Sequence, residues 1–512
     1  MSRFNKTFSR FMKSCVLAAA VILSVTVLAP VQAPAAGKVL TVGVAAFPDS
    51  LDTGLSSYAT ANLLSQMYEP LVVRDDNSQL LPCLAVSWDN PTPTVWRFKL
   101  RENVSFHDGA PFTADDVVHT FEYILGDPLY ANRGRISPVE SVRKVDTHIV
   151  EFETKAPFPT MLIALSDMFI QPRHYQEKVG REGMRAHPIG TGPFVFAKWV
   201  PGDSLELTAN DAYWGGRPKV DKVLMRQIPE GSTRVASLLA GETQIIEEVP
   251  MDLLAAIERN AKTEVASVES TVGLLVTYDA RKAPFDNPLV REALDYAVNK
   301  PLILEKLLYD NGKVLDGQML TSNTFGHNPN LRARPYDPAK AKALLAEAGY
   351  PDGFSTSITT RSGKYLSDVD ITNAIAGNLL EIGVKAEVNV VEGGVFSKMI
   401  KAQDLGPMHI VGWYSIGDAD FATVWFTQES QRAFWKNEEY EDLFIKARST
   451  VDQAERQQYY NRMMEIFHEE NPAICLFGLP SVYGKAANLT GWSPPADKSI
   501  RLHTAEFEGA GR

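Results

Sequence analysis

Hydrophobic and polar residues alternate in several short segments of the chain, the pattern that half-buried β-strands produce. A Pro-Gly-Asp turn separates the last two of these segments, which are therefore expected to form a hairpin. The segments are residues 38–47, 94–106, 147–155, 195–200 and 204–210. Because they are short and separated by turns, they predict sheet structure throughout the first half of the chain.

In the second half, apolar residues spaced three and four apart indicate helices. Asn287 and Asp337 stand where N-cap residues are expected, and each is followed by a proline suited to the first helical position. Gly349 is placed to end the second of these helices. The two Asn/Asp-Pro pairs therefore predict where these helices begin.

A strand, a helix and a second strand follow one another further along the chain, as in a parallel βαβ unit. They are expected at residues 354–361, 368–381 and 384–392. Neither an internal repeat nor a long linker is visible in the sequence. The pattern therefore predicts an α/β protein of two closely connected lobes.

The N-terminal segment differs from the rest. It carries four basic residues before position 14 and no acid, then a largely apolar run from Cys15 to Ala29 without any charged residue, then small residues. The run is shorter than the ~18–20 residues of a spanning helix, so we expect a signal peptide over residues 1–36, cleaved near Ala35 or Ala36. The mature protein is expected to be exported to the periplasm and soluble.

Composition and charge narrow the function further. The 512 residues are 45% hydrophobic and 22% charged, which is ordinary for a globular protein of two or three domains. Loss of the four basic N-terminal residues would take the formal net charge from −11 to −15. An acidic protein repels nucleic acid, and none is expected as a partner. Outside the leader only Cys83 and Cys475 remain, either as one disulfide or as two buried thiols.

The stretch "FHDGAPFTADDVVHTF", residues 106–121, contains histidines and aspartates. It could be a metal-binding site or only the start of a helix. Asp115 and His119 are four apart, as two metal ligands on one helix face would be. Thr113, however, precedes an apolar-periodic run and has Asp116 three residues later, the pattern of an N-capping box. The capped helix is the interpretation that we favour, and no metal site is predicted.

Motifs of hydrolases and dinucleotide enzymes are incomplete. "HEENP" at His468 has Pro472 where a zinc protease requires histidine, and no Gly-x-Ser-x-Gly sequence exists. "GTGPF" at Gly190 lacks the third glycine of a dinucleotide loop. We therefore predict a protein that is not an enzyme and has no catalytic residue and no cofactor.

Several long blocks, in order, resemble the family-5 extracellular solute-binding proteins, the receptors of ABC importers for dipeptides, oligopeptides, glutathione and nickel. The most specific is "RENVSFHDGAPFTADDVVHTFEYI", from Arg101. Others are "PIGTGPFVFAKWVPGDSLELTANDAYWGGRPKVDKVLMRQIPE", "LLAGETQI", "FDNPLVREALDYAVNK" and "YDPAKAKALLAEAGYPDGF". "GDADF" and "KAANLTGW" are most similar to the glutathione and peptide branch.

The resemblance implies the fold of a two-lobed periplasmic binding protein with a hinge and an extra subdomain on the first lobe. The crossings between lobes are expected near 273–282 and 473–482. Lobe one would comprise 37–276 and 479–512, with the extra subdomain at about 84–192, and lobe two would comprise 277–478. Ligand would bind between the lobes, which close around it.

The resemblance also implies binding residues in the second lobe. Arg361 matches the family's carboxylate-binding arginine, while Gly412 and Trp413 match its Gly-Trp pair, followed here by Tyr414. Ile416 stands where the family has an aspartate that binds the amino group. Asp418 and Asp420 lie nearby and could replace it.

The function implied is that of a periplasmic receptor, expected to be a monomer. It would deliver a di- or oligopeptide or a glutathione-like solute to an inner-membrane ABC permease and its ATPase. A nickel-chelate or oligosaccharide receptor of the same fold is the alternative. A periplasmic enzyme or chaperone on this scaffold is a further one.

Overall fold

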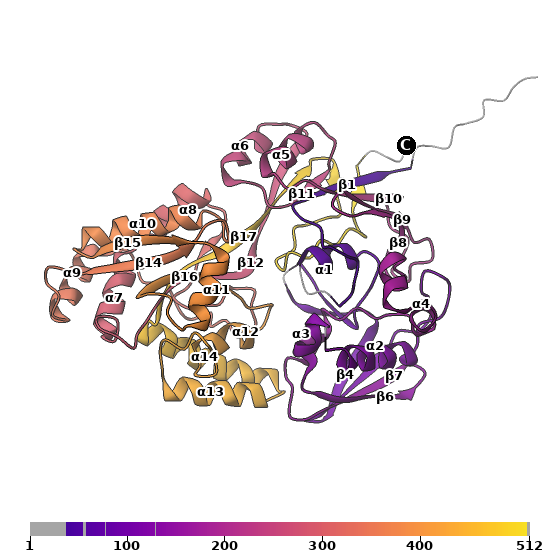
Figure 1. Ribbon diagram of the computed structural model, residues 1–512, viewed down its shortest axis with the longest axis horizontal. Coiled ribbons are helices and arrows are strands. Elements are labelled where there is room, and N and C mark those ends of the chain that lie inside the picture. The colour runs from indigo at the N-terminus through magenta and orange to yellow at the C-terminus, as the bar shows by residue number, and fades with distance from the viewer. Residues whose placement is uncertain (1–36, 55–57, 77, 129, 509–512) are drawn as a thin grey trace, which may run out of the picture. The chain divides into compact units, whose positions relative to one another are not determined.

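The structure is a computed structural model that describes residues 37–508, except for residues 55–57, 77 and 129. The predicted signal peptide, residues 1–36, lies outside the described residues. Within them, no helix is both long and apolar enough to cross a bilayer. The α/β class predicted from the sequence is confirmed, since helices cover a large mixed sheet (Figure 1).

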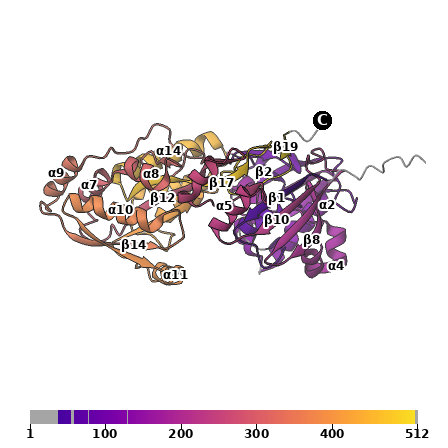
Figure 2. The ribbon, with the colours of Figure 1, turned by 90° about the horizontal axis from the view of Figure 1, so that it is seen from above.

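The main sheet has eleven strands, in the order β15-β14-β16-β12-β17-β11-β1-β10-β9-β8, with β13 also pairing to β17. β12 and β17 are its longest strands, spanning Thr263–Tyr278 and Ala473–Ala486. Both are almost continuously buried where they meet the second half of the chain, and such apolar runs are typical of central strands. They lie side by side in the middle of the sheet (Figure 2).

The pairing of β12 with β17 changes register between Glu269 and Gly273. At this break the Ser270 hydroxyl donates a hydrogen bond to the carbonyl of Leu479, 2.6 Å away. On one side of the break β17 pairs with β11, and on the other β12 pairs with β16. We call the β11 side the first lobe and the β16 side the second lobe. The predicted lobe boundaries stay predictions.

In the second lobe, the parallel βαβ unit forms as predicted, with α10 over the predicted residues Asp368–Glu381. The Asn287 and Asp337 side chains accept hydrogen bonds from the first turns of their helices, as N-caps do. The strands are β13 (Lys313–Val314), β14 (Ser355–Arg361), β15 (Lys385–Val391) and β16 (Met408–Tyr414). The helices around them are α7 (Pro288–Ala297), α8 (Lys300–Leu308), α9 (Pro338–Glu347), α10 and α11 (Gly393–Lys401).

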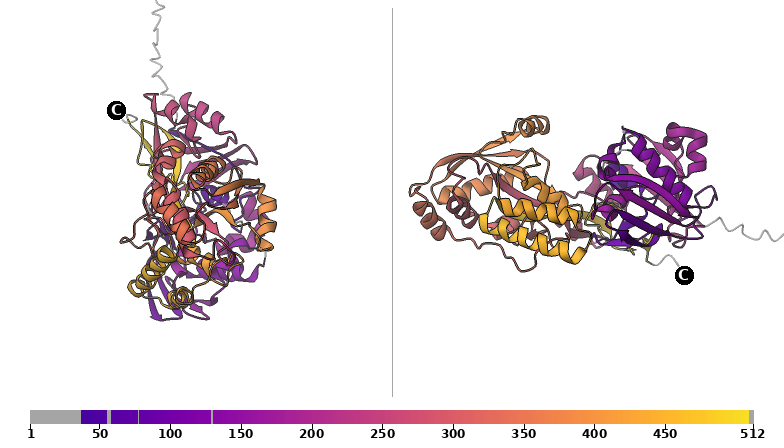
Figure 3. Two further views of the ribbon diagram at one scale, coloured as in Figure 1. Left: turned by 90° about the vertical axis from the view of Figure 1, so that its left-hand side faces the viewer. Right: turned by 90° about the horizontal axis from the view of Figure 1, so that it is seen from below.

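Two further helices complete this lobe and form an antiparallel hairpin, α13 (Glu438–Ser449) and α14 (Gln453–Glu470) (Figure 3). Asn437 caps α13 by accepting from the backbone N–H of Tyr440. Short turns α12 (Asp420–Thr423) and η3 (Val424–Phe426) lie between β16 and this hairpin. The hairpin was not predicted from the sequence, although Asn437 followed by acidic residues is a recognisable helix start.

The first lobe is built on strands β1, β10, β9 and β8 of the main sheet, and the predicted hairpin is present as β8 and β9. Their bounds are β1 Val39–Val44, β8 Phe194–Val200, β9 Ser204–Ala209, β10 Lys222–Gln227 and β11 Ile245–Ile246. The helices and turns are α1 (Tyr58–Leu64), α3 (Met161–Leu165), α4 (Arg173–Ala186), α5 (Gly231–Leu239), η2 (Met251–Leu253) and α6 (Leu254–Glu258). Two small sheets pair β2 (Val72–Arg74) with β3 (Leu80–Pro82) and β18 (Leu489–Thr490) with β19 (Glu506–Phe507).

A separate four-stranded antiparallel sheet, in the order β4-β5-β7-β6, lies within the range predicted for the extra subdomain. Its strands are β4 (Ala85–Thr92), β5 (Val95–Leu100), β6 (Val139–Asp146) and β7 (Ile149–Thr154), and a turn η1 (Ala131–Ile136) precedes β6. Helix α2 (Ala114–Gly126) packs against β6 and β7. The capping box of Thr113 and Asp116 is present in both directions, so the structural interpretation of that motif is confirmed.

Both cysteines are free thiols in the structure. Cys83 and Cys475 are buried, and burial raises the pKa of each thiol. Of the two alternatives left open by the sequence, the structure has the pair of buried thiols.

Candidate functional site

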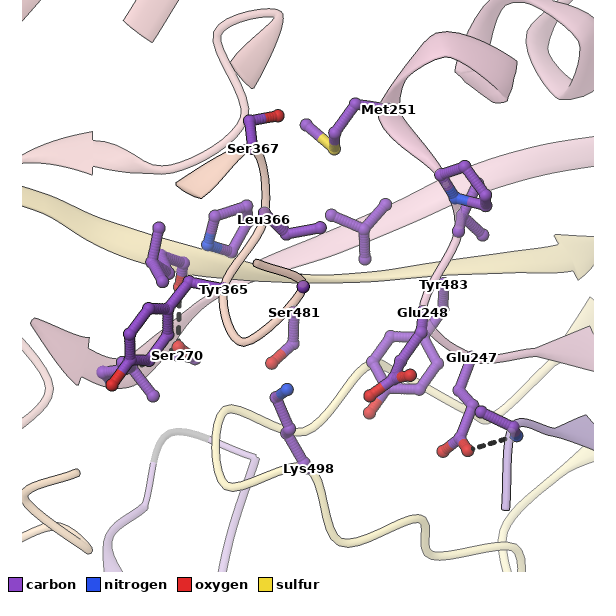
Figure 4. A pocket seen from close by; sticks show the side chains of 18 of the residues that line it. Glu247, Glu248, Met251, Ser270, Tyr365, Leu366, Ser367, Ser481, Tyr483 and Lys498 are labelled. Carbon is purple, nitrogen blue, oxygen red and sulfur yellow. Dashed lines mark hydrogen bonds between the residues drawn. The ribbon is translucent and has the colours of Figure 1, made fainter. Parts of the chain in front are cut away.

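A cavity of about 800 Å³ lies beside the register break of β12 and β17. Both lobes contribute to its wall, through segments that are far apart in the sequence (Figure 4). The first lobe supplies the ends of β1 and β11 and the loop that holds Lys498, and the second supplies the end of α8, the loop at 363–367 and Tyr414. A cavity of this size suits a small organic ligand.

Several residues in the cavity wall have a strained backbone. Four non-glycine residues in its wall have left-handed backbone conformations, with φ of 50° to 62°. They are Glu248, Tyr309, Ser367 and Lys498. Such conformations are unfavourable for residues with a Cβ and persist where the surroundings enforce them, often at ligand sites. Their gathering around one cavity marks it as the candidate functional site.

The wall from the first lobe is acidic. Glu247 and Glu248 follow β11 directly, and Figure 4 shows their carboxylates close to Tyr483. Glu247 accepts a hydrogen bond from the backbone N–H of Ala45 at 2.8 Å. Burial, helped by the neighbouring Glu248, raises the pKa of Glu247 to about 7. Glu248 is exposed.

The wall from the second lobe is a loop held rigidly after β14. The buried Asp368 carboxylate accepts hydrogen bonds from the backbone N–H groups of Gly363, Lys364 and Tyr365, at 2.8 to 3.2 Å. This fixes Tyr365, Leu366 and Ser367 in the cavity wall (Figure 4). Burial, with the nearby Arg361 and Lys498, lowers the pKa of the Lys364 ammonium.

Arg361, the predicted carboxylate ligand, lies at the carboxyl end of β14, next to this wall but outside the cavity lining. Its Nη2 donates to the Tyr365 hydroxyl at 2.8 Å, and Tyr365 donates in turn to the carbonyl of Gly412 at 3.2 Å. The guanidinium also lies 4.4 Å from the ring centroid of Phe396. Among residues 37–508, apart from the gaps named above, Arg361 has no acidic partner, and its buried Nε has no hydrogen-bond acceptor.

The predicted Gly-Trp-Tyr segment ends β16, a strand whose first residues pair in parallel with β14. Gly412 allows close packing, since a Cβ there would lie 2.6 Å from the Tyr365 ring. Trp413 is buried and stacks on Trp425, with 4.9 Å between ring centroids. Tyr414 is the one member of the predicted set in the cavity wall, and burial raises its pKa.

Asp418 and Asp420, the predicted amine ligands, both hold arginines of the helical hairpin. The two oxygens of buried Asp418 each accept from Arg456 at 3.0 Å. Asp420 accepts from Arg448 at 2.8 and 3.2 Å. Neither carboxylate lines the cavity.

The histidines of the opening motif have ordinary structural partners. His119 contacts the Gln176 side chain at 2.9 Å, and His107 contacts the carbonyl of Gly192 at 3.0 Å. Asp115 pairs with Lys144 at 2.7 Å. In the part of the chain that the structure describes, no three His, Cys, Asp or Glu side chains are arranged to hold a metal ion.

Four features of the site were not found by sequence reasoning: the acids Glu247 and Glu248, Lys364, Lys498, and Arg432 near the Trp413–Trp425 stack. Glu247 and Glu248 follow a short apolar strand, and the carboxyl end of a strand is where open α/β sheets place ligands. That placement could have identified the two glutamates. Lys498 and Arg432 lie in loops and carry no local signature.

Comparison with known proteins identifies the family of this chain. Residues 79–434 match the family model described as "Bacterial extracellular solute-binding proteins, family 5 Middle". The chain belongs to this family. The family resemblance predicted from the sequence is confirmed.

Individual relatives agree with this assignment. Glutathione-binding protein GsiB of Shigella flexneri is 29% identical over 482 residues, which cover 89% of this chain and 93% of the relative. HbpA2 of Haemophilus parasuis is similar in structure, with a TM-score of 0.84 and 25% identity, over 92% of this chain and all of that one. The periplasmic binding protein DppA of Helicobacter pylori, in complex with the peptide STSA, has a TM-score of 0.72 and 26% identity, over 92% and 98%.

Proposed function

We propose that this protein is the periplasmic receptor of an ABC importer and captures a peptide-class solute in the cavity beside β12 and β17. The family and the relatives named for glutathione and peptide binding support this assignment. The loaded receptor would dock on an inner-membrane permease driven by its ATPase. The relatives are binding proteins, and we propose that this chain likewise catalyses no reaction.

One observation carries the proposal: the cavity wall presents charges of both signs that are not joined in ion pairs among the described residues. Glu247, Glu248, Lys364 and Lys498 line it, and among the described residues none of the four is in an ion pair with a neighbour. A partly buried charge without a counter-ion is unfavourable, and a ligand of opposite charge would relieve that cost. A zwitterion with a free amine and a free carboxylate complements such a wall.

The ends of the ligand can be assigned by charge. We propose that its carboxylate reaches Arg361, whose guanidinium fork matches a carboxylate in two parallel bonds. Tyr414 and Tyr365 would flank the chain between the ends. Asp418 and Asp420 already pair with Arg456 and Arg448, so we propose that they stabilise the helical hairpin. We therefore assign the binding of the ligand's amine to Glu247 and Glu248.

Native mass spectrometry of the purified protein tests the assignment directly. A co-purified peptide-class ligand is expected, and calorimetry with di- and tripeptides and with glutathione should give saturable binding. Bound peptide should be recovered intact after prolonged incubation. Recovery of hydrolysed peptide would indicate an enzyme, and binding of only sugars or metal chelates would favour another receptor of this fold.

A further inference from the structure

Arg432 lies in the loop between η3 and α13 and has no counter-charge among the residues that the structure describes. Its guanidinium carbon is 4.8 Å from the ring centroid of Trp413 and 4.9 Å from that of Trp425. Within the described part of the chain, the guanidinium makes no hydrogen bond and no ion pair, and its Nε is a buried donor without an acceptor. The cation is therefore held by aromatic faces alone.

Buried arginines elsewhere in the protein are fully engaged. Arg74 and Arg456 pair with aspartates, while Arg234 and Arg291 donate to backbone carbonyls. Of the half-buried or buried arginines, Arg361 and Arg432 each carry a buried Nε without a partner. Leaving a desolvated cation unpaired is unfavourable, so the exception points to a partner outside the protein chain.

The two exceptional arginines are linked through Tyr365 and the end of β16. Arg361 donates to the Tyr365 hydroxyl, which donates to the carbonyl of Gly412, and the next residue, Trp413, carries Arg432 on its ring. Burial lowers the pKa of Arg432 to about 10, and the charge of Arg361 adds to the effect. His409 lies against the same cluster and contributes no charge, because burial and the two arginines lower its pKa to about 3. The nearby acid Asp279 is already paired with Arg281 and Lys282. In the part of the chain that the structure describes, neither arginine is therefore neutralised by an acidic side chain.

The surroundings of the two arginines suit a ligand rather than bulk water. Arg361 stands at the carboxyl end of β14 and Trp413 near that of β16, at the edge where α/β sheets receive ligands. Tyr365 joins this cluster to the cavity, since it contacts Arg361 and also lines the wall. Planar guanidinium groups stacked on rings are oriented in advance for bidentate bonds to carboxylates.

We propose that Arg361 and Arg432 form a two-arginine site for two carboxylates of one ligand, so that the solute is a peptide-class molecule with an acidic group besides its terminal carboxylate. This inference rests on the proposed peptide-receptor function and narrows its ligand class. Arg432 would be the residue that selects acidic peptides over neutral ones.

The test uses matched di- and tripeptides that carry Glu or Gln at one position, together with glutathione, on the full-length mature protein. Wild-type protein should bind the Glu member at least 30-fold more tightly than the Gln member. Arg432→Gln should reduce this preference to less than threefold while leaving the affinity for the Gln member unchanged. Arg462→Gln serves as a control, because Arg462 is paired with Glu439 on the surface of α14, and it should keep the preference.

Thermal melting separates recognition from structural support. Without ligand, Arg432→Gln should melt at the same temperature as wild type or higher, because it removes an unpaired buried charge. A lower melting temperature with equal weakening of both peptides would make Arg432 a support for the tryptophan stack and overturn the inference. Equal wild-type affinity for Glu and Gln peptides would also overturn it and leave the peptide receptor intact. Failure of every peptide to bind would overturn the proposed function itself.

Discussion

Replacing Arg361 by Ala should remove the main contact with the ligand carboxylate. The Arg361 guanidinium is oriented by a hydrogen bond to Tyr365 and by the ring of Phe396, and no acidic side chain among the described residues pairs with it. It is therefore available to a ligand carboxylate. The substitution would also leave Tyr365 without its Arg361 donor, although the bond from Tyr365 to Gly412 would remain.

The magnitude follows from the environment of the guanidinium. Two unit charges 4 Å apart attract by about 4 kcal/mol at an effective dielectric constant of 20, which suits a half-buried position. Truncating one partner of a desolvated charge pair usually weakens binding by about 2–5 kcal/mol. Arg361→Ala should therefore raise Kd by a factor of about 30 to 5,000. Lys at this position should restore part of the affinity, because a point charge cannot reproduce the fork.

Calorimetry on four combinations of protein and ligand measures this contact directly. Wild type and Arg361→Ala are each titrated with the natural ligand and with an analogue whose terminal carboxylate is amidated. The loss caused by the substitution should vanish for the amidated analogue, since its carboxylate is already gone. If Arg361→Ala binds the natural ligand as tightly as wild type, the proposed carboxylate role of Arg361 is wrong.

Three further predictions concern the cap, the acidic wall and the lobes. Thr113→Ala should lower the free energy of unfolding by about 1 kcal/mol in a denaturant titration, while neither it nor His119→Ala changes ligand affinity; metal retained by wild type and lost from His119→Ala would contradict this. The pKa of Glu247 is raised from 4.5 to about 7, so the folded state holds the extra proton and wild-type stability should fall as pH rises from about 4.5 through about 7, by up to about 3 kcal/mol. Glu247→Gln should abolish that fall and Glu248→Gln should retain it, and parallel stability curves for wild type and Glu247→Gln would refute the assignment. Ligand should reduce the radius of gyration in small-angle scattering through lobe closure, and an unchanged radius at saturation would argue against a hinge.

Features encoded by neighbouring residues could be predicted from the sequence. The caps at Thr113, Asn287 and Asp337 act on backbone groups two or three residues away, so their chemistry is complete within a short window. The bounds of α10 were predicted correctly for the same reason. The family resemblance supplied the two-lobed fold, because its motifs extend over most of the mature chain.

Features that depend on distant residues could not be predicted in this way. Asp418 is a candidate amine ligand from the family resemblance, as a replacement for the aspartate that Ile416 displaces, but its arginine partner, Arg456, comes from α14, 38 residues later. Glu247 and Lys364 meet at one cavity only because β12 and β17 bring the two lobes together. No local pattern of residues contains that information.

Charges in the core of the protein and charges near the cavity differ in whether the chain supplies their partners. Where a buried charge serves the fold, the chain supplies its partners: Asp418 pairs with Arg456, Asp295 pairs with Lys300, and backbone carbonyls accept from Arg234. Around the cavity this rule is broken on both sides: the acids of the first lobe and the arginines of the second have no counter-ions among the described residues. A desolvated charge without a counter-ion is unfavourable in the empty protein. We therefore expect Arg361 and Arg432, each with a buried Nε that lacks an acceptor, to weaken the free receptor and to provide affinity and selectivity when a ligand pairs with them. Substitutions that neutralise them should therefore separate stability from binding, whereas substitutions of Arg456 or Asp418 should reduce both together.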